Sequence, residues 1–517
     1  MRRGRKGLTG EKGEGMGKYL LGMDIGTSGC KVAVFSEDGK VLCSDTQGYE
    51  VYYPHEGWAE QNPDDWYAAL CAATKNVLEK GKIDPAGIAG VGIDGQGWSA
   101  IPLDMEGSVL CNTPIWFDVR AQDICGEIRR TIGDEAIFRV CGNPNSPSYT
   151  SPKVMWYKKH LPEVYQKTDK ILQSNSFIAY RLTGAFSQDV CQSYGLHFFD
   201  MRQKRYDGAL CAELGLRPGM FPEPVPCHTV VGRVTKEAAR RTGLLEGTPV
   251  VAGGLDAACG SLGAGVLDEG ETQDQGGQAG GMSICMDEYV ADPRLILSTH
   301  VAPDKYLLQG GTVGGGGVMR WLHEQFGEHE REVAARMGQN SFDLLTQLAS
   351  TVPAGSDGLV FLPYMAGERS PIWDPHAKGV YYGIDYRKKR AHFIRAALEG
   401  AVFSVRHNLE VAYAAGAKVA VLNAMGGSAN SEFWTQMKAD ITGKDIVVPY
   451  ADEATTLGAA ILAGVGVGVY GDFRQARKKT LTIRRRHTAS DRDKAVYDAA
   501  YDTYLQLYQN LKDMMRR

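Results

Sequence analysis

The stretch LGMDIGTSGCKVAVFSEDG, residues 21–39, constrains the fold more than any other part of the chain. Apolar residues lead to Asp24, a turn of glycines and hydroxyls follows, and a second strand-like run begins at Val32. This order predicts a polar β-hairpin. Backbone N–H groups that point into such a turn form a site for anions, and the hydroxyls add donors, so the turn is either purely structural or a phosphate site.

A second glycine hairpin is predicted in the other half of the chain. Residues 271–287, ETQDQGGQAGGMSICMD, again have the pattern of strand, glycine turn and strand, with the turn at 276–281. Each half also has a later strand, at 88–93 and 418–423, so we interpret the chain as an internal duplication with a boundary near 260–270. Two such hairpins could hold a nucleotide polyphosphate from both sides, with Asp24 placed to bind Mg²⁺ directly or through water.

Composition narrows the class of protein. A chain of 517 residues is too long for one core and predicts two domains. The net charge of −4 gives no electrostatic reason to expect nucleic acid or an anionic membrane as partner. The 11 cysteines are scattered without a C-x-x-C pair, which indicates a reducing, cytoplasmic location.

Asp256 is the first candidate for chemistry. It follows the apolar run at 250–252 and begins a small-residue helix in VVAGGLDAACGSLGAG, residues 250–265. Ligands of α/β folds bind at such strand ends. Two interpretations remain open: Asp256 is a helix-capping residue, or it is a general base that accepts a proton from an attacking hydroxyl.

A polar cluster in the first half suits a polyhydroxylated ligand. Carboxylate, amide and guanidinium groups can bond hydroxyl pairs, and an indole can stack on C–H faces. The candidate substrate-binding residues are Asp94, Gln96, Gly97, Trp98, Asp118 and Arg120, with Trp116 between them. The equally weighted alternative is a buried Asp118–Arg120 ion pair that only braces its loop.

At these residues, and over nearly the whole length from about Tyr19, the chain resembles the FGGY carbohydrate kinases, and in general pattern the xylulokinases among them. The resemblance is carried by the segments WAEQNPDDWY, WFDVR, SPSYTSPKVMWYKKH, FLPYMAGERSP, GVYYGIDYRKKRAHFIRAALE and MGGSANSEFWTQMKADITG. It implies two actin-like (ribonuclease-H-like) α/β ATPase domains with ATP in the cleft between them. The expected parts are a disordered leader at 1–17, an N-terminal domain at 18–264, a C-terminal domain at 265–475 and a helical tail at 476–517.

The resemblance also implies residue roles. Asp256 matches the family's catalytic base and Asp24 its metal-associated aspartate. The residues that match ATP-binding positions are Thr27, Ser28, Lys31, Gly277, Gln278, Gly316, Gly427 and Ser431. Two segments depart from the family pattern: the second phosphate loop reads Gly-Gln-Ala-Gly at 277–280 without hydroxyls, and the sugar turn reads Gln-Gly-Trp-Ser at 96–99 where xylulokinases have Gln-Met-His-Gly.

The expected activity is ATP-dependent phosphorylation of a sugar, of the ketopentose type, on a primary hydroxyl, with Mg²⁺ and with Asp256 as base. The altered sugar turn predicts that D-xylulose is not the best substrate. A tetritol or hexitol kinase of the same family is the alternative within the class. The alternatives outside the class of carbohydrate kinases are a non-kinase actin-like ATPase and a catalytically silent sugar sensor. The oligomeric state stays open, with a homodimer as one alternative.

Overall fold

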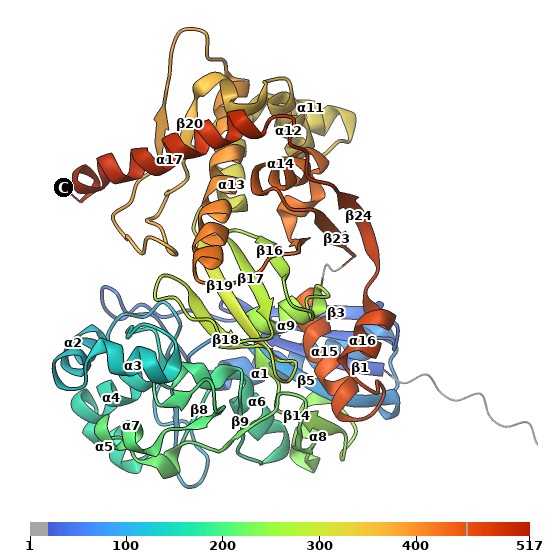
Figure 1. Cartoon of the computed structure of the whole chain (residues 1–517). Coiled ribbons are helices and arrows are strands. Elements are labelled where there is room, and N and C mark those ends of the chain that lie inside the picture. The colour runs from blue at the N-terminus through green and yellow to red at the C-terminus, as the bar shows by residue number, and fades with distance from the viewer. Residues whose placement is uncertain (1–18, 451–452, 517) are drawn as a thin grey trace, which may run out of the picture.

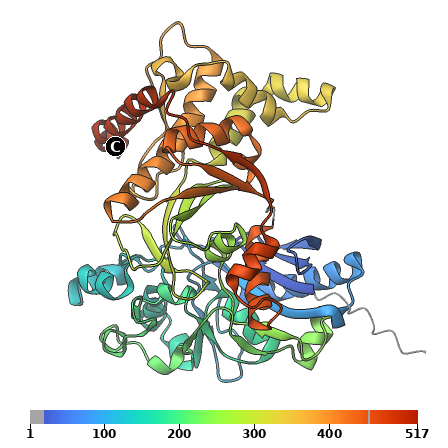
Figure 2. The ribbon, with the colours of Figure 1, turned by 45° about the vertical axis from the view of Figure 1, so that its right-hand side comes forward.

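The protein consists of two α/β domains stacked one above the other (Figure 1). The computed structural model describes residues 19–450 and 453–516, so the leader expected at 1–17 lies outside the described residues. Each domain is built on a seven-stranded sheet. The strands of the first sheet, coloured blue to green, lie in the lower domain, and those of the second sheet, coloured yellow-green to red, lie in the upper domain (Figures 1 and 2).

The first sheet begins with the predicted meander. Its strands are β1 (Tyr19–Ile25), β2 (Gly29–Phe35), β3 (Val41–Gly48), β5 (Ile88–Gly95), β13 (Val230–Arg233), β14 (Pro249–Val251) and β15 (Gly254–Leu255). β1 pairs antiparallel with β2 and parallel with β5, which in turn pairs parallel with β14 and β15. Helices α1 (Pro63–Gly81), α4 (Thr150–His160) and α6 (Ser174–Thr183) belong to the same domain. Asn62 caps α1 by accepting from the Asp64 N–H, as the Asn-Pro start signal predicts.

The second sheet repeats this plan. Its strands are β16 (Glu271–Gly276), β17 (Gly280–Met286), β18 (Ile296–Thr299), β19 (Tyr306–Thr312), β22 (Val421–Met425), β23 (Ile446–Pro449) and β24 (Ile483–His487). β16 pairs antiparallel with β17 and parallel with β22, as β1 does with β2 and β5. The principal helices of this domain are α10 (Gly316–Phe326), α12 (Ser341–Ser350), α13 (Arg390–Ala414), α14 (Glu432–Thr442) and α17 (Lys494–Met515). The shared pairing pattern is the one that an internal duplication requires.

One helix crosses the expected domain boundary. Helix α15 (Ala454–Gly466) lies within the stretch expected to form the C-terminal domain, but it packs on β1, β5 and α9 (Asp256–Gly263) of the lower domain (Figures 1 and 2). Glycines allow this approach: a Cβ on Gly22 or Gly92 would lie within 2 Å of a carbonyl oxygen of α15. Many of the chain's glycines therefore serve helix packing as well as turns.

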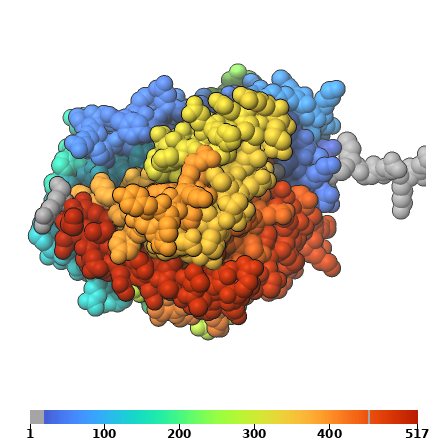
Figure 3. Space-filling view, turned by 90° about the horizontal axis from the view of Figure 1, so that it is seen from above, coloured from blue at the N-terminus to red at the C-terminus, as the bar shows by residue number. Residues whose placement is uncertain are grey.

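The tail also differs from the expected helical segment. After α16 (Phe473–Thr480), strand β24 pairs antiparallel with β23 and extends the second sheet. Helix α17 then buries four tyrosines at helical spacing, Tyr497, Tyr501, Tyr504 and Tyr508. Seen from above, the red C-terminal segment runs along the upper domain beside the orange segment (Figure 3). Within 19–450 and 453–516, every helix is too short or too polar to cross a membrane.

Candidate functional site

Three carboxylates meet where neighbouring strands of the first sheet end. Asp24 on β1 pairs with Asp94 on β5, and Asp94 pairs with Gly254 on β15, two residues before Asp256. Parallel strands place their carboxyl ends at one edge, which is where ligands of α/β folds bind. Residues 24, 94 and 256 are therefore close together despite their separation in sequence.

The three carboxyls influence one another's protonation. Removal from bulk water, with the charge of Asp24 adding to it, raises the pKa of Asp256 to about 7. Burial also raises the pKa of Asp24 to about 6, and it raises the pKa of Asp94 well above its ordinary range, aided by the charge of Asp24. Neighbouring carboxyl groups whose pKa values are shifted from the ordinary range are typical of acid–base sites.

Asp24 fits the expected cation. Its Oδ1 is buried and has no hydrogen-bond partner in the described part of the chain, so a positive charge would satisfy it. Within the same residues, no three His, Cys, Asp or Glu side chains are grouped to enclose a metal. Mg²⁺ suits such a site, because it keeps several waters and takes only one or two carboxylates together with substrate phosphates.

Asp256 opens helix α9 directly after β15. Its Oδ1 accepts a hydrogen bond of 2.6 Å from the Ala257 N–H, whereas Leu255 occupies the capping position of α9. No basic side chain of the described residues pairs with it. The half-buried carboxyl can therefore accept a proton near neutral pH.

An aromatic cavity of about 660 Å³ is lined by both domains and includes Trp98, which follows Asp94 by four residues. The lower domain contributes Trp98, Trp116, Phe117 and Tyr149, and the upper domain contributes Glu368, Arg369 and Trp373. Of the six candidate substrate-binding residues Trp98 lines it, together with Trp116 from the same polar cluster. Trp98 has a left-handed backbone, φ 63°, which a bulky residue adopts only under strain.

The Trp98 indole is held by other aromatics. It meets Tyr149 and Tyr194 edge to face, with ring centroids 4.7 Å and 5.5 Å away. A Cβ on Gly195 would lie 2.7 Å from the indole, so glycine is needed there. The Trp98 Nε1–H is buried beside the Tyr194 side chain and has no acceptor of normal geometry among the described residues.

Lys153 is a positioning residue that the sequence analysis missed. Its buried ammonium donates to the carbonyls of Trp98 and Ile115, at 2.9 Å each, and so joins two loops of the cavity wall. Burial lowers the pKa of Lys153 to about 7. Its place in the segment SPSYTSPKVMWYKKH was the available signal, but its contacts depend on the tertiary fold.

Asp118 and Arg120 form the ion pair that was the alternative to substrate binding. Arg120 Nη2 lies 2.9 Å from Asp118 and 2.7 Å from Glu60, and Asp118 also accepts from the Ala59 N–H. The guanidinium stacks 4.0 Å over the Trp58 ring. Both side chains are buried and engaged with each other, which favours the bracing alternative, and substrate contact by Asp118 or Arg120 stays a prediction.

Asp94, Gln96 and Gly97 do not line the cavity either. Asp94 is buried against Asp24, and Gln96 is 1% exposed. The Gln96 amide donates to Gln61 at 2.8 Å and accepts from the Thr27 hydroxyl at 3.4 Å. Thr27 in turn accepts from the Trp116 indole at 3.0 Å. The Thr27 side chain therefore links the first glycine turn to the cavity wall, and phosphate binding by Thr27 stays a prediction.

Five of the predicted ATP-binding residues line a second cavity of about 330 Å³ in the upper domain. They are Gly277, Gln278, Gly316, Gly427 and Ser431. The Gly316 N–H donates to the Gly277 carbonyl at 2.8 Å, which ties α10 to the second glycine turn. The Ser431 hydroxyl caps α14 by accepting from the Trp434 N–H. The cavity is open to a nucleoside beside the glycine turn.

The other three predicted ATP-binding residues, Thr27, Ser28 and Lys31, lie on the first hairpin. Ser28 is exposed at its tip, where it is available to a ligand. Lys31 lies beside Asp24 across the hairpin and forms a 3.0 Å ion pair with Glu453 at the start of α15. Phosphate binding by Lys31 would require this pair to open.

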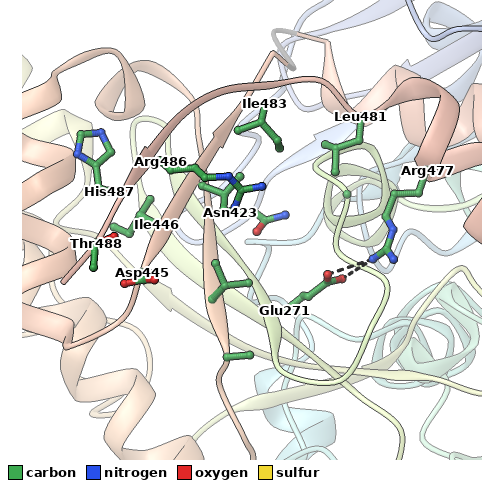
Figure 4. Close-up of a pocket in the computed structure, with 14 residues that line it drawn as sticks. Glu271, Asn423, Asp445, Ile446, Arg477, Leu481, Ile483, Arg486, His487 and Thr488 are labelled. Carbon is green, nitrogen blue, oxygen red and sulfur yellow. Dashed lines mark hydrogen bonds and ion pairs between the residues drawn. The ribbon is translucent and has the colours of Figure 1, made fainter.

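A third cavity, of about 560 Å³, lies on the edge of the second sheet away from these carboxylates. Figure 4 shows Arg477 pointing toward Glu271, with which it forms an ion pair, and Asp445 near Ile446 and Thr488. Arg477 also pairs with Asp268, and Asp445 accepts from the Ala489 N–H. With these charges satisfied within the protein, the cavity has no arrangement for chemistry.

Comparison with known proteins agrees with this geometry. The family model described as "FGGY family of carbohydrate kinases, N-terminal domain" matches residues 19–263, and its C-terminal counterpart matches residues 285–467. The chain is 29% identical over 499 residues to a xylulose kinase of Bacillus subtilis (strain 168), covering 96% of this chain and 98% of that protein. It is 30% identical over 460 residues to a gluconokinase of Bacillus licheniformis, covering 89% of each.

Solved structures show the same fold. The xylulose kinase of Rhodospirillum rubrum superposes with a TM-score of 0.86 at 27% identity, over 97% of this chain and 100% of that one. The gluconate kinase of Lactobacillus acidophilus gives 0.87 at 26% identity, over 96% and 98%. The two family models together match most of the chain and identify it as a member of the FGGY family of carbohydrate kinases.

Proposed function

We propose that this carbohydrate kinase transfers the γ-phosphoryl group of ATP to a primary hydroxyl of a ketopentose-like sugar, with Asp256 as general base. The observation that carries the proposal is the position of Asp256 at the lower-domain sheet edge. It lies beside Asp24 and near Tyr194, whose ring packs on Trp98 in the aromatic cavity. A pKa near 7 matches a base that must accept a proton at neutral pH.

Phosphoryl transfer depends on positioning and charge neutralisation, and different residues provide each of these. The aromatic cavity holds the acceptor, with its hydroxyl toward Asp256. The second cavity holds the nucleoside, and the two glycine turns face the polyphosphate. Bound Mg²⁺, held at Asp24, would supply charge neutralisation for the phosphates. Trp116, Thr27 and Gln96 connect the acceptor wall to the first glycine turn.

The test is an acceptor panel assayed by coupled ADP release. Wild-type protein should release ADP only with an acceptor, and D-xylulose, other ketopentoses and linear polyols should be ranked by kcat/KM. The aromatic turn at Trp98 predicts that D-xylulose is not ranked first. ADP release without any sugar would favour the actin-like ATPase, and none with any acceptor would favour the sensor.

Arg369 favours a second candidate acceptor, a sugar acid. Its guanidinium lines the aromatic cavity and has no hydrogen-bond or ion-pair partner among the described residues, and burial lowers its pKa. A guanidinium removed from water is stabilised by a carboxylate, which it can bond in a bidentate manner. The relatives named as gluconokinases make such an acceptor reasonable.

Matched acid and neutral acceptors separate the two candidates. If the acceptor is an acid, a five- or six-carbon aldonate should exceed its corresponding polyol in kcat/KM, and Arg369→Gln should remove that preference. If the acceptor is neutral, the polyol or ketose should be preferred, and Arg369→Gln should leave the ratio between them unchanged.

A further inference from the structure

Two strained tryptophans line the same cavity from opposite domains. Trp98 has φ 63° and Trp373 has φ 46°. In the described ranges, the other non-glycine residues with positive φ are Lys82, Lys204, Asp304, Ser356 and Asp357, none of which is aromatic. Bulky residues in this conformation are outliers, and such strain concentrates at ligand clamps and active sites.

The segment that carries Trp373 is fixed at both ends. Glu368 and Asp374 exchange backbone hydrogen bonds of 2.9 and 3.0 Å, which close the loop 368–374. The buried Glu368 carboxylate accepts from the Thr312 hydroxyl and the Val313 N–H at the end of β19, at 2.7 Å each. The buried Asp374 carboxylate accepts from the Tyr508 hydroxyl of α17 at 2.9 Å. The loop is therefore rigid, and the tail helix helps to hold it.

The Trp373 side chain is oriented but not enclosed. Its Nε1–H donates to the Arg294 carbonyl at 2.8 Å, and 43% of the residue remains exposed. The indole nitrogen is thus satisfied within the protein, and the apolar ring remains beside the cavity. Fixing an aromatic ring in a strained, half-exposed position has no benefit for core packing, because so much of the ring contacts solvent.

We propose that Trp373 is an acceptor-binding residue that the upper domain lays on a C–H face of the sugar, opposite the surface formed by Trp98 in the lower domain. The inference rests on the proposed function and deepens it: the acceptor site is complete only when both domains contribute.

The first experiment measures KM separately for both substrates in Trp373→Ala and Trp373→Phe. The acceptor is the one that wild type turns over fastest. Trp373→Ala should raise the acceptor KM about tenfold while the ATP KM stays within about twofold, since a lost stacking contact acts on the acceptor alone. Trp373→Phe should restore most of the acceptor affinity. Tyr386→Ala, a fully exposed aromatic of the same domain outside all the cavities described, is the control and should change neither.

A second variant separates binding from loop structure. Trp373→Gly removes both the ring and the left-handed strain, so it should melt at a higher temperature than Trp373→Ala yet have the same raised acceptor KM. An acceptor KM within about twofold of wild type in Trp373→Ala would overturn the proposal, whatever the melting temperature. A wild type that phosphorylates no acceptor would instead refute the proposed function, so the two failures are distinguishable.

Discussion

The two glycine hairpins have the same topology, but only one of them pairs its aspartate with a lysine. In each, an aspartate lies two residues before the first glycine of the turn: Asp24 in the lower domain and Asp274 in the upper. Asp274 forms a buried 2.5 Å ion pair with Lys438 of α14. Asp24 has no such contact, because the lysine beside it, Lys31, pairs with Glu453. One copy keeps its carboxylate unpaired for a cation, and the other uses it to hold the domain together.

The strand-to-helix connections differ in the same way. Asp256 opens α9 without a cationic partner, whereas Glu453, at the corresponding start of α15, is neutralised by Lys31. The two halves have similar backbones, and they differ in which carboxylates are paired with a lysine. The unpaired carboxylates are the ones available for chemistry. The predictions below test this contrast.

The largest effect is expected at Asp256. Asp256→Asn keeps the size of the side chain but cannot accept the proton, so kcat should fall about 10²–10⁴-fold. Nucleotide binding, measured by thermal shift with an ATP analogue, should be retained. Asp502→Asn, at an exposed site on α17, is the control. A decrease of less than about tenfold would leave Asp256 a structural residue at the start of α9.

The paired variants Asp24→Asn and Asp274→Asn test the two hairpins directly. Asp24→Asn should lower kcat about 10²-fold and raise the Mg²⁺ concentration needed for half-maximal activity, with the melting temperature unchanged or higher. Asp274→Asn should leave Lys438 buried and unpaired, at a cost of about 3–5 kcal/mol in the free energy of unfolding.

The readouts for this pair are Mg²⁺ titration of activity and chemical denaturation. Asp274→Asn should retain its kcat under conditions in which it remains folded. If both variants lose activity without losing stability, or if both lose stability alone, the contrast between the hairpins is wrong.

Trp98→Ala sharpens the comparison between the two walls of the cavity. Loss of the indole should raise the acceptor KM about tenfold with the ATP KM unchanged. The double variant with Trp373→Ala should raise the acceptor KM by less than the product of the two single effects. The reason is that a sugar held between two rings is already loosely held once either ring is lost. A variant that melts early but has normal acceptor kinetics would place Trp98 in the core.

The smallest effect concerns pH, where activity and stability should change in opposite directions. The pKa of Asp256 is raised to about 7 from an ordinary 3.8, so the folded state holds a proton that the unfolded chain has lost between these values. The free energy of unfolding should therefore fall as pH rises from about 4 to 7. Activity should rise over the same range, with kcat/KM at pH 6 about one tenth of its plateau. Asp256→Asn should weaken the pH dependence of stability.

The site was predictable where it depends on local pattern. The turn at 24–29, the strand end at Asp256 and the glycines at 277 and 316 are marked by short-range sequence signals, and the structure places each at an edge or cavity. The site was not predictable where it depends on contacts between side chains that are distant in sequence. Arg369 and Trp373 lie in or beside the segment FLPYMAGERSP, but nothing local shows that they line the same cavity as Trp98 of the other domain.

The sequence by itself therefore determined the two hairpins, the order of strands and helices, and the family, because hydrogen-bonded turns and hydrophobic periodicity are local properties. Only the tertiary structure decided that α15 packs on the lower sheet, that Asp118 pairs with Arg120, and that Asp274 but not Asp24 is neutralised. Lys438 is 164 residues from Asp274, so this pair forms only when the domain closes around it. Burial and charge pairing depend on the whole fold, and they decided which of the chain's many carboxylates are free to act.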